Sequence, residues 1–265
     1  MVVPFVITDV NSHLSPPPPR LDSTEYAEGY RQLLDYGGDG IQYPTLRTSQ
    51  QTETGIFWAY DGTPGLGKPP RLYNQVVRTI AIQRRNTVES NARLFALVNL
   101  AMADAGIQCW YIKYHYQLWR PVIGIRNGDN DTNDFTIGDL TWLPLGAPAT
   151  NGGGDGVNFT PPFPAYGSGH ATFGAAAFSV TARFYGTSEI PFRFTSDEFN
   201  GINRGIDGNV RPVVTRTYYN LDEAILENAI SRIYLGIHWP YDASAGMDAG
   251  YRIASEVYES ALSPR

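Results

Sequence analysis

The sequence contains a single cysteine, Cys109, among its 265 residues. One thiol cannot form an intramolecular disulfide, and it rules out zinc and iron–sulfur sites that need several cysteine ligands. The Cys-x-x-Cys-His pattern that attaches haem covalently is excluded for the same reason. Any metal or redox chemistry in this chain must therefore use side chains other than thiolates.

The chain also lacks a positive net charge, because its formal charge is −6 at pH 7. Nucleic acids and anionic membranes both bind basic surfaces, so we expect neither as a partner. The first residues do not combine a basic segment with an apolar one, so we expect no recognisable signal peptide; the secretion route stays open. The apolar stretch near 173–184 is too short to span a bilayer, so we expect a soluble protein with no membrane span.

The sequence does have enough apolar residues for a large core. Hydrophobic residues make up 42% of the chain and charged residues 17%, as in ordinary globular proteins. The 27 glycines and 19 prolines indicate long, turn-rich loops. We predict a mainly α fold, a helical bundle with long loops. An extended N-terminal arm at 1–23 would precede a single helical domain at 24–265, which would carry the catalytic site.

Helical periodicity locates most of the bundle. Apolar residues at helical spacing predict a helix from Glu89 toward Trp119, which Pro121 would end. Asn220 and Glu223 form a capping pair that opens a helix through Leu235. Further helices are predicted at 24–34, at 168–185 and from Pro240 onward, a short strand at 213–219, and loops at 35–54 and 127–164.

Three cations occupy positions that a core should fill. Arg232 shares a helix face with Ile225 and Ala229, which the helix should bury. Lys113 and Arg120 are seven residues apart and would stack on one side of the long predicted helix. Buried cations are costly unless anions neutralise them. Alternatively, each side chain extends to solvent or pairs with an acidic residue.

Two short motifs add to these cations. The run Gly167-Ser168-Gly169-His170 starts a predicted helix, where free amides and a hydroxyl bind anions, although Gly-Ser-Gly is also a common linker. In the run Gly236-x-His238-x-x-x-Asp242, the carboxylate can fix the tautomer of His238 by hydrogen bonding. The same run of residues would also occur if Gly236 only capped a helix and His238 were only a buried structural residue. Together, the cations and motifs predict a pocket for a tetrahedral, phosphate-like oxyanion.

This combination resembles the superfamily of vanadium-dependent haloperoxidases and type 2 phosphatidic acid phosphatases. The likeness is closer to the fungal vanadium chloroperoxidase branch and its bacterial relatives, and it covers roughly residues 24–260. The segments that carry it further are Phe57-Trp-Ala-Tyr-Asp61-Gly, Pro69-Pro-Arg-Leu-Tyr-Asn-Gln75, Ala92-Arg-Leu-Phe-Ala-Leu97, Pro161-Pro-Phe-Pro-Ala-Tyr166 and Glu227-Asn-Ala-Ile-Ser-Arg232.

The resemblance implies a role for each residue of the pocket. His238 would be the protein ligand to vanadium in a vanadate cofactor, whose site phosphate can also occupy. Lys113, Arg120, Arg232, Ser168 and the Gly169 amide would bind the vanadate oxygens. His170 would be the acid–base residue, and Asp61 would pair with Arg232. Trp110 and Phe163 would form the aromatic pair near the halide.

The implied reaction is the oxidation of chloride or bromide by hydrogen peroxide to hypohalous acid, which then halogenates small organic acceptors. Arginine forks and a helix N-terminus suit vanadate, because it mimics phosphate. Vanadium would stay oxidised and act as a Lewis acid. His170 is placed to accept a proton from peroxide, and Lys113 to polarise it.

Two features depart from the family pattern. Gly167 precedes Ser-Gly-His where the family usually has proline, so the preferred halide stays open. The chain is also short, because haloperoxidases of this branch usually carry a second, N-terminal helical bundle. We therefore expect a compact form, a truncated form, or a homodimer or partner bundle that covers the exposed face.

Three other functions fit parts of the pattern. An acid phosphatase would use the same pocket, with His238 as nucleophile and His170 as general acid. A non-catalytic phosphate or sulfate binder would need the cations but not His170, so a His170→Ala variant separates binding from turnover. An interaction module would use the exposed helix face to bind a partner subunit. Trp110 and Phe163 favour the peroxidase.

Overall fold

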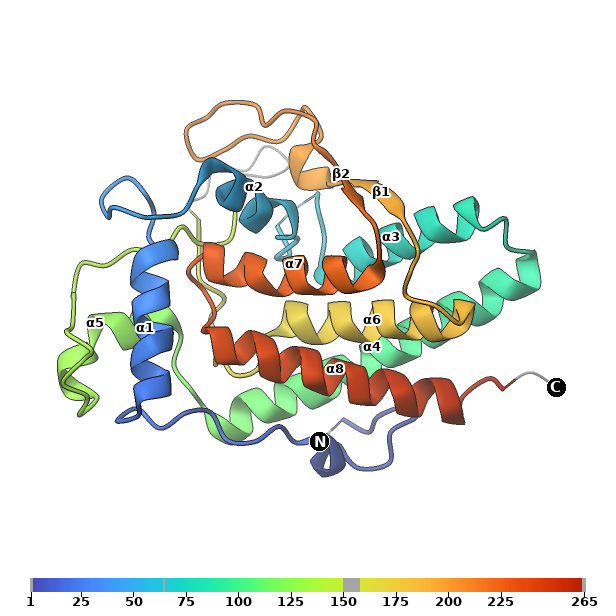
Figure 1. Cartoon of the computed structure of the whole chain (residues 1–265), viewed down its shortest axis with the longest axis horizontal. Helices are drawn as coiled ribbons and strands as arrows, with labels where there is room; N and C mark the ends of the chain where they lie inside the picture. The colour runs from blue at the N-terminus through green and yellow to red at the C-terminus, as the bar shows by residue number, and fades with distance from the viewer. Residues whose placement is uncertain (1, 64, 150–157, 264–265) are drawn as a thin grey trace.

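The computed structural model describes residues 2–63, 65–149 and 158–263. The helices are α1 (Thr24–Tyr36), α2 (Ser49–Phe57), α3 (Pro69–Gln83), α4 (Val88–Tyr116), α5 (Pro121–Arg126), α6 (Gly169–Tyr185), α7 (Leu221–Tyr234) and α8 (Pro240–Ser260), with 3-10 turns η1 (Val10–His13), η2 (Gly128–Asn130) and η4 (Asp197–Phe199). Strands β1 (Phe192–Thr195) and β2 (Thr215–Tyr218) pair antiparallel, with Phe192 opposite Tyr218. The predicted mainly α bundle with long loops is confirmed (Figure 1).

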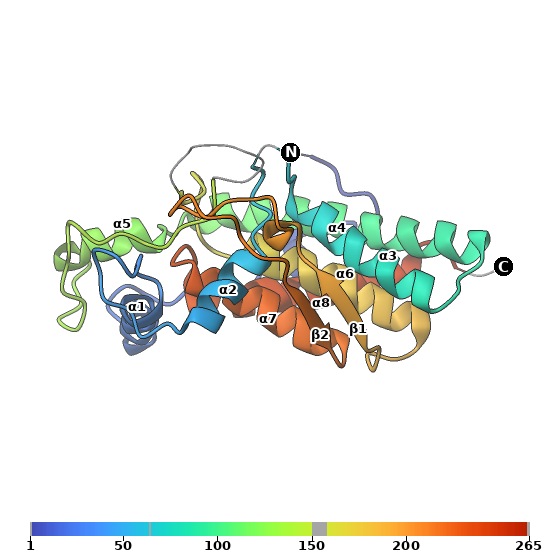
Figure 2. The same cartoon turned by 90° about the horizontal axis from the view of Figure 1, so that it is seen from above.

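Helix α6 lies at the centre of the bundle. Figure 2 shows α3 and α4 on one side of it and α7 and α8 on the other. Small residues let α8 come within backbone contact of α6. A Cβ added at Gly250 would lie 2.5 Å from the carbonyl oxygen of Thr172, and one at Gly246 would lie 2.7 Å from that of Ser168. This contact fixes where α6 begins.

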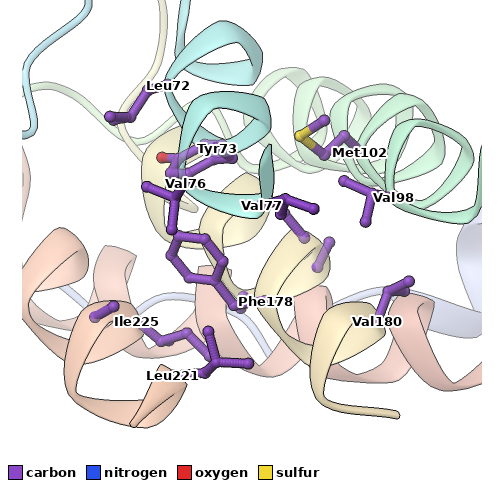
Figure 3. Close-up of a cluster of buried hydrophobic side chains, with 14 of the residues drawn as sticks. Leu72, Tyr73, Val76, Val77, Val98, Met102, Phe178, Val180, Leu221 and Ile225 are labelled. Atoms are coloured by element: carbon purple, nitrogen blue, oxygen red, sulfur yellow. The ribbon is translucent and has the colours of Figure 1, made fainter. Parts of the chain in front are cut away.

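Apolar side chains from three helices fill the space beside α6 (Figure 3). Tyr73 of α3 meets Phe178 of α6 edge to face, with ring centroids 5.6 Å apart. Other members of this cluster are Val76, Val77, Val98, Leu221 and Ile225. Removing a ring from such a core costs about 3–5 kcal/mol. The core therefore holds α6 rigidly against its neighbours.

The N-terminal segment lies along the bundle. It is mostly irregular, with the turn η1 inside it. The buried carboxylate of Asp104 accepts hydrogen bonds from the amides of Phe5, Val6 and Ile7, at 2.6, 2.8 and 2.9 Å. These bonds attach the arm to the middle of α4.

The predicted long helix is shorter than expected. Helix α4 ends at Tyr116 rather than near Trp119, because Gln117 adopts a left-handed backbone with φ of 52°. Pro121 begins α5 instead of ending α4. Lys113 and Arg120 therefore lie on opposite sides of a break, and the prediction that they stack on one helix is wrong. The stretch Val88–Arg126 is long and apolar enough to cross a membrane, but half of its apolar window is buried in this bundle.

Besides α5, helices α2 and α3 were not expected. Residues 49–54, predicted as loop, belong to α2, whose start is capped by reciprocal hydrogen bonds between Thr48 and Gln51. Helix α3 begins at Pro69, where proline suits the first turn because no amide is needed there. Within the predicted loop at 127–164, the glycine run 152–154 lies outside the described residues, and Ala147 pairs with Phe159 across it.

Candidate functional site

Four distant stretches of the chain meet at the N-terminal end of α6. They are the segment after α2, the connection between α4 and α5, the start of α6 itself, and the turn between α7 and α8; Trp110 of α4 and the loop residues 159–163 complete the lining. They enclose a cavity of about 360 Å³. Its lining is Asp61, Lys68, Pro69, Pro70, Trp110, Arg120, Phe159, Pro161, Pro162, Phe163, Gly169, His170, Phe173, Arg232 and His238.

The turn between α7 and α8 presents His238 to this cavity. Gly236 makes the turn with φ of 71°, where a Cβ would collide with the carbonyl of Gly37. Nδ1 of His238 lies 2.9 Å from Oδ2 of Asp242 and donates to it, so the lone pair is on Nε2. Burial, and then the charges of Arg120 and Lys113, lower the pKa of His238 well below its ordinary value. The imidazole is therefore neutral and has a fixed tautomer.

Arg120 is the first cation that lines the cavity. Its Nε donates to the carbonyl of Phe163 at 2.8 Å and its Nη1 to that of Ile237 at 2.7 Å. Nη1 also lies 2.9 Å from Nε2 of His238. Its Nη2 is buried and has no acceptor in the described part of the chain. Burial lowers the pKa of Arg120 to about 10, so the guanidinium stays charged at neutral pH.

Arg232 is the second cation that lines the cavity, and it forms an ion pair with Asp61. Nη2 of Arg232 donates to Oδ1 of Asp61 at 2.6 Å, and both side chains are almost fully buried. The Nε and Nη1 atoms of Arg232 and the Oδ2 atom of Asp61 have no partner among residues 2–63, 65–149 and 158–263. The pair predicted from the sequence is thus present, and most of the guanidinium remains available.

The unpaired donors fit an oxyanion. A buried donor without an acceptor costs about 1–3 kcal/mol, so such groups are uncommon unless a ligand satisfies them. Here, buried guanidinium nitrogens of two arginines are directed into one cavity, beside the first amides of α6. The lone pair of His238 adds one ligand for a central atom. This set suits phosphate, and a neutral imidazole nitrogen beside the donors would also suit vanadate.

Lys113 is buried beside the loop that precedes Ser168. Its Nζ donates to the carbonyls of Pro164, Ala165 and Gly167, at 3.0, 2.9 and 2.7 Å. Burial lowers the pKa of Lys113 to about 7, but three acceptors require the protonated ammonium. The charge of Lys113 acts on the cavity while its hydrogens hold the loop before Ser168. Its direct contact with an oxyanion stays a prediction.

Ser168 and Gly169 form the start of α6. Ser168 is the N-cap, and its hydroxyl oxygen accepts from the amide of Ala171 at 3.4 Å. The hydroxyl hydrogen remains available to donate. Gly169 lines the cavity, and a Cβ there would come within 3.5 Å of the Trp110 ring.

His170 has the opposite tautomer from His238. Its Nε2 donates to the backbone carbonyl of Ala59, which leaves the lone pair on Nδ1. Burial, and then the charge of Arg232, lower the pKa of His170 to about 3. An anion in the cavity would offset the charge of Arg232 and raise this pKa. The pKa of His170 therefore depends on whether an anion occupies the cavity beside Arg232.

We predict that neither buried imidazole titrates near neutral pH. In phosphate-free buffer, the ring signals of His170 and His238 should stay constant from pH 8 to pH 5 in a 15N NMR titration. Because the unfolded chain binds more protons below its pKa of about 6.5, stability should fall as pH decreases from 6.5 toward 3. A midpoint near 6.5 for either ring would contradict the buried, neutral arrangement.

The predicted aromatic pair lies at the edge of the cavity. The rings of Trp110 and Phe163 have centroids 5.2 Å apart. The guanidinium carbon of Arg120 lies 4.9 Å from the centroid of Phe163. Sequence reasoning missed the exposed Lys68, together with Phe159 and Phe173. The sequence Lys68-Pro69-Pro70 is typical of a helix start, and this pattern could have indicated that Lys68 precedes a helix.

Sequence comparison finds two matches. A family model, the VCPO second helical-bundle domain, matches residues 93–264. Vanadium chloroperoxidase of Curvularia inaequalis is 40% identical over 276 aligned residues, which cover 90% of this chain and 44% of that protein. The chain thus spans less than half the length of this relative.

Structure comparison supports the same fold. A bacterial vanadium-dependent iodoperoxidase matches with a TM-score of 0.72 and 23% identity, over 98% of this chain and 55% of the other. The apo form of a bacterial vanadium-dependent chloroperoxidase matches with a TM-score of 0.68 and 14% identity, over 97% and 53%. Identities this low support the fold alone.

Proposed function

The chain belongs to the vanadium chloroperoxidase family, and from this premise we propose that it is a vanadate-dependent haloperoxidase. It would oxidise chloride or bromide with hydrogen peroxide to hypohalous acid. The observation that supports this most is the set of buried, unpaired guanidinium donors beside the unprotonated Nε2 of His238, which accepts from Arg120. Family membership makes vanadate, rather than phosphate alone, the proposed occupant.

Arg120 and Arg232 would bind the vanadate oxygens, and His238 would ligate the metal through Nε2. When bound, vanadate supplies a Lewis acid that activates peroxide without changing oxidation state. The protein's part is preorganisation: Asp242 orients His238, Asp61 orients Arg232, and Lys113 holds the loop that precedes Ser168. Donors fixed in this way need no reorganisation during the reaction.

His170 would move the proton. Its Nδ1 carries the lone pair while Ala59 holds Nε2–H, so the ring can accept a proton at one nitrogen without turning. A resulting imidazolium would lie near Arg232, so it forms only when an anion offsets that charge. This arrangement links proton transfer to occupancy of the site.

The aromatic wall would bind the halide. Trp110 and Phe163 supply apolar surface that weakens hydration of an anion, while the cations nearby keep it attracted. Hypohalous acid is small and leaves through the same opening, so halogenation of organic acceptors needs no dedicated site. The organic acceptor is therefore left unspecified.

Lys68 should assist halide entry. It is exposed at the opening of the cavity and, in the described part of the chain, forms no ion pair. A Lys68→Met variant should raise the KM for bromide about threefold with kcat unchanged, which is the effect of one exposed charge. Steady-state kinetics at several salt concentrations measures it. The effect should diminish at high salt, because screening weakens long-range attraction. An unchanged KM at low salt would exclude this role.

An acid phosphatase is the second candidate, because the same donors suit a phosphoryl group. His238 Nε2 would attack phosphorus and His170 would protonate the leaving group. The family match favours the haloperoxidase.

A single comparison tests the two functions. The purified chain is loaded with orthovanadate and given hydrogen peroxide and bromide, and bromination of a phenolic dye is followed. A parallel sample without vanadate receives a phosphate monoester. Bromination that requires vanadate supports the proposal. Ester hydrolysis with no bromination would replace it with the phosphatase.

A partner bundle or a second copy would contact the groove between α2, α7 and α8. This groove has apolar lining from Leu226, Ile230, Ile233 and Met247. Molar mass in solution, measured by light scattering, tests for the homodimer.

A further inference from the structure

The segment Ala59–Asp61 makes two contacts with the anion site. The carbonyl of Ala59 accepts from His170, and Oδ1 of Asp61 accepts from Arg232. The segment follows α2 and has no regular structure. Tyr60, between the two contacts, has φ of 43°, in a region that residues other than glycine seldom adopt. Something outside the segment must therefore hold it in this conformation.

Glu198 makes the hydrogen bond that holds the segment. The amide of Tyr60 donates to Oε1 of Glu198 at 3.1 Å. The other carboxylate oxygen, Oε2, accepts from Nη1 of Arg211 at 2.6 Å. Both side chains are buried, at 0% and 7% exposure. A carboxylate in this environment is costly, since burial raises the pKa of Glu198 to about 7.

The same loop makes two more contacts, one with the end of α2 just before the segment and one with the segment itself. The hydroxyl of Ser196 donates to the carbonyl of Phe57 at 2.6 Å, and the amide of Asp197 donates to the hydroxyl of Tyr60 at 2.8 Å. These residues follow β1, and the loop returns to the bundle at β2. The connection between the strands thus reaches the anion site from outside the helical bundle.

We propose that Glu198 is a positioning residue for the anion site, which acts through the backbone of Tyr60 to place Ala59 against His170 and Asp61 against Arg232. The effect of this positioning role on turnover rests on the proposed haloperoxidase function. Its effect on the geometry of His170 and Arg232 does not depend on that function.

The bonding pattern predicts how Glu198→Gln fails. Glu198 accepts from a donor on each oxygen, and glutamine offers one accepting oxygen and one donating nitrogen. Whichever way the amide turns, it places N–H against either the Tyr60 amide or the Arg211 guanidinium. The substitution keeps the size of the side chain, so it removes the bond without opening a cavity.

NMR of the histidine rings tests the proposal. The chain has four histidines, so 15N ring signals can be assigned with a His170→Ala variant. In the unaltered protein, His170 should show the Nε2–H tautomer alone. In Glu198→Gln, the signals should move toward a mixture of both tautomers. Phosphate affinity, measured by calorimetry, should weaken about tenfold, which corresponds to about 1.4 kcal/mol.

Asp104→Asn is the matched control. Asp104 is also a buried carboxylate that accepts backbone amides, but it attaches the N-terminal arm. It should lower stability while the His170 tautomer and phosphate affinity stay as in the unaltered protein. If Glu198→Gln does not fold, Ser196→Ala removes a milder contact of the same loop, to the carbonyl of Phe57 just before the segment, and should shift the tautomer in the same direction.

A native His170 tautomer and native phosphate affinity in folded Glu198→Gln would overturn the proposal. So would equal changes in Glu198→Gln and Asp104→Asn. Failure of the haloperoxidase function would appear differently, as a lack of vanadate-dependent bromination by the unaltered protein. The tautomer measurement needs neither vanadate nor peroxide, so it tests the positioning role by itself.

Discussion

Replacing His238 by alanine should reduce vanadate-dependent bromination by more than about a thousandfold. The substitution removes the lone pair that the Asp242 hydrogen bond directs into the cavity. It leaves Arg120 and Arg232 in place, so phosphate should still bind, although more weakly. Activity is measured in vanadate-saturated buffer, and vanadate and phosphate affinity by calorimetry.

His115→Ala is the control for this variant. His115 is an exposed imidazole at the end of α4 and does not line the cavity. Its removal should leave bromination and vanadate affinity unchanged. Retention of more than a tenth of the activity in folded His238→Ala would show that vanadium is held by another group, and the mechanism proposed for this chain would be wrong.

The largest effect on stability should come from Gly250→Val. A Cβ at this position would lie 2.5 Å from the carbonyl oxygen of Thr172 and 2.7 Å from Cβ of Ala175. The obstructing atoms are the backbone and a short side chain of α6, which cannot turn away. The helices must separate, so we expect a loss of about 3 kcal/mol or more in the free energy of unfolding. Urea denaturation followed by circular dichroism measures it.

Ser244→Val on the same helix separates packing from helix propensity. Ser244 is exposed, so the same β-branched residue should cost less than about 1 kcal/mol there. If both variants lose equal stability, close packing of α6 against α8 is not what limits the fold. Because α6 starts at the anion site, a folded Gly250→Val should also bind phosphate less tightly.

Short-range patterns predicted much of the site. The spacing of His238 and Asp242 places a carboxylate on the first turn of α8, and the structure has this bond at 2.9 Å. The seven-residue spacing from Ile225 to Arg232 placed the guanidinium on a buried face, where it is 1% exposed. Both inferences depend only on helix geometry, which the sequence specifies locally.

The error at Lys113 and Arg120 has a local cause. The spacing argument assumed a continuous helix, but Gln117 takes a left-handed conformation that glycine or asparagine would have indicated better. Once the helix breaks, Lys113 faces the carbonyls of Pro164, Ala165 and Gly167. Sequence spacing does not reveal which acceptors a loop will offer.

The role of Glu198 was out of reach for another reason. It is 138 positions from Tyr60 in sequence, and their contact depends on how the loop between β1 and β2 returns to the bundle. A glutamate in a loop is usually exposed to solvent, and nothing in the sequence around Glu198 indicates that it is buried. Only the assembled fold shows that Glu198 is buried and accepts from Tyr60 and Arg211, and the proposed positioning role rests on these contacts.

The unpaired nitrogens of Arg120 and Arg232 should make this protein bind the anions of common laboratory salts. Sulfate, phosphate and arsenate all carry the oxygens these groups lack, and whatever binds the folded chain alone adds to its stability by mass action. A melting temperature recorded in phosphate and one recorded in Tris therefore describe different equilibria. The anions present during purification and measurement should therefore be kept the same when the stabilities of variants of this chain are compared.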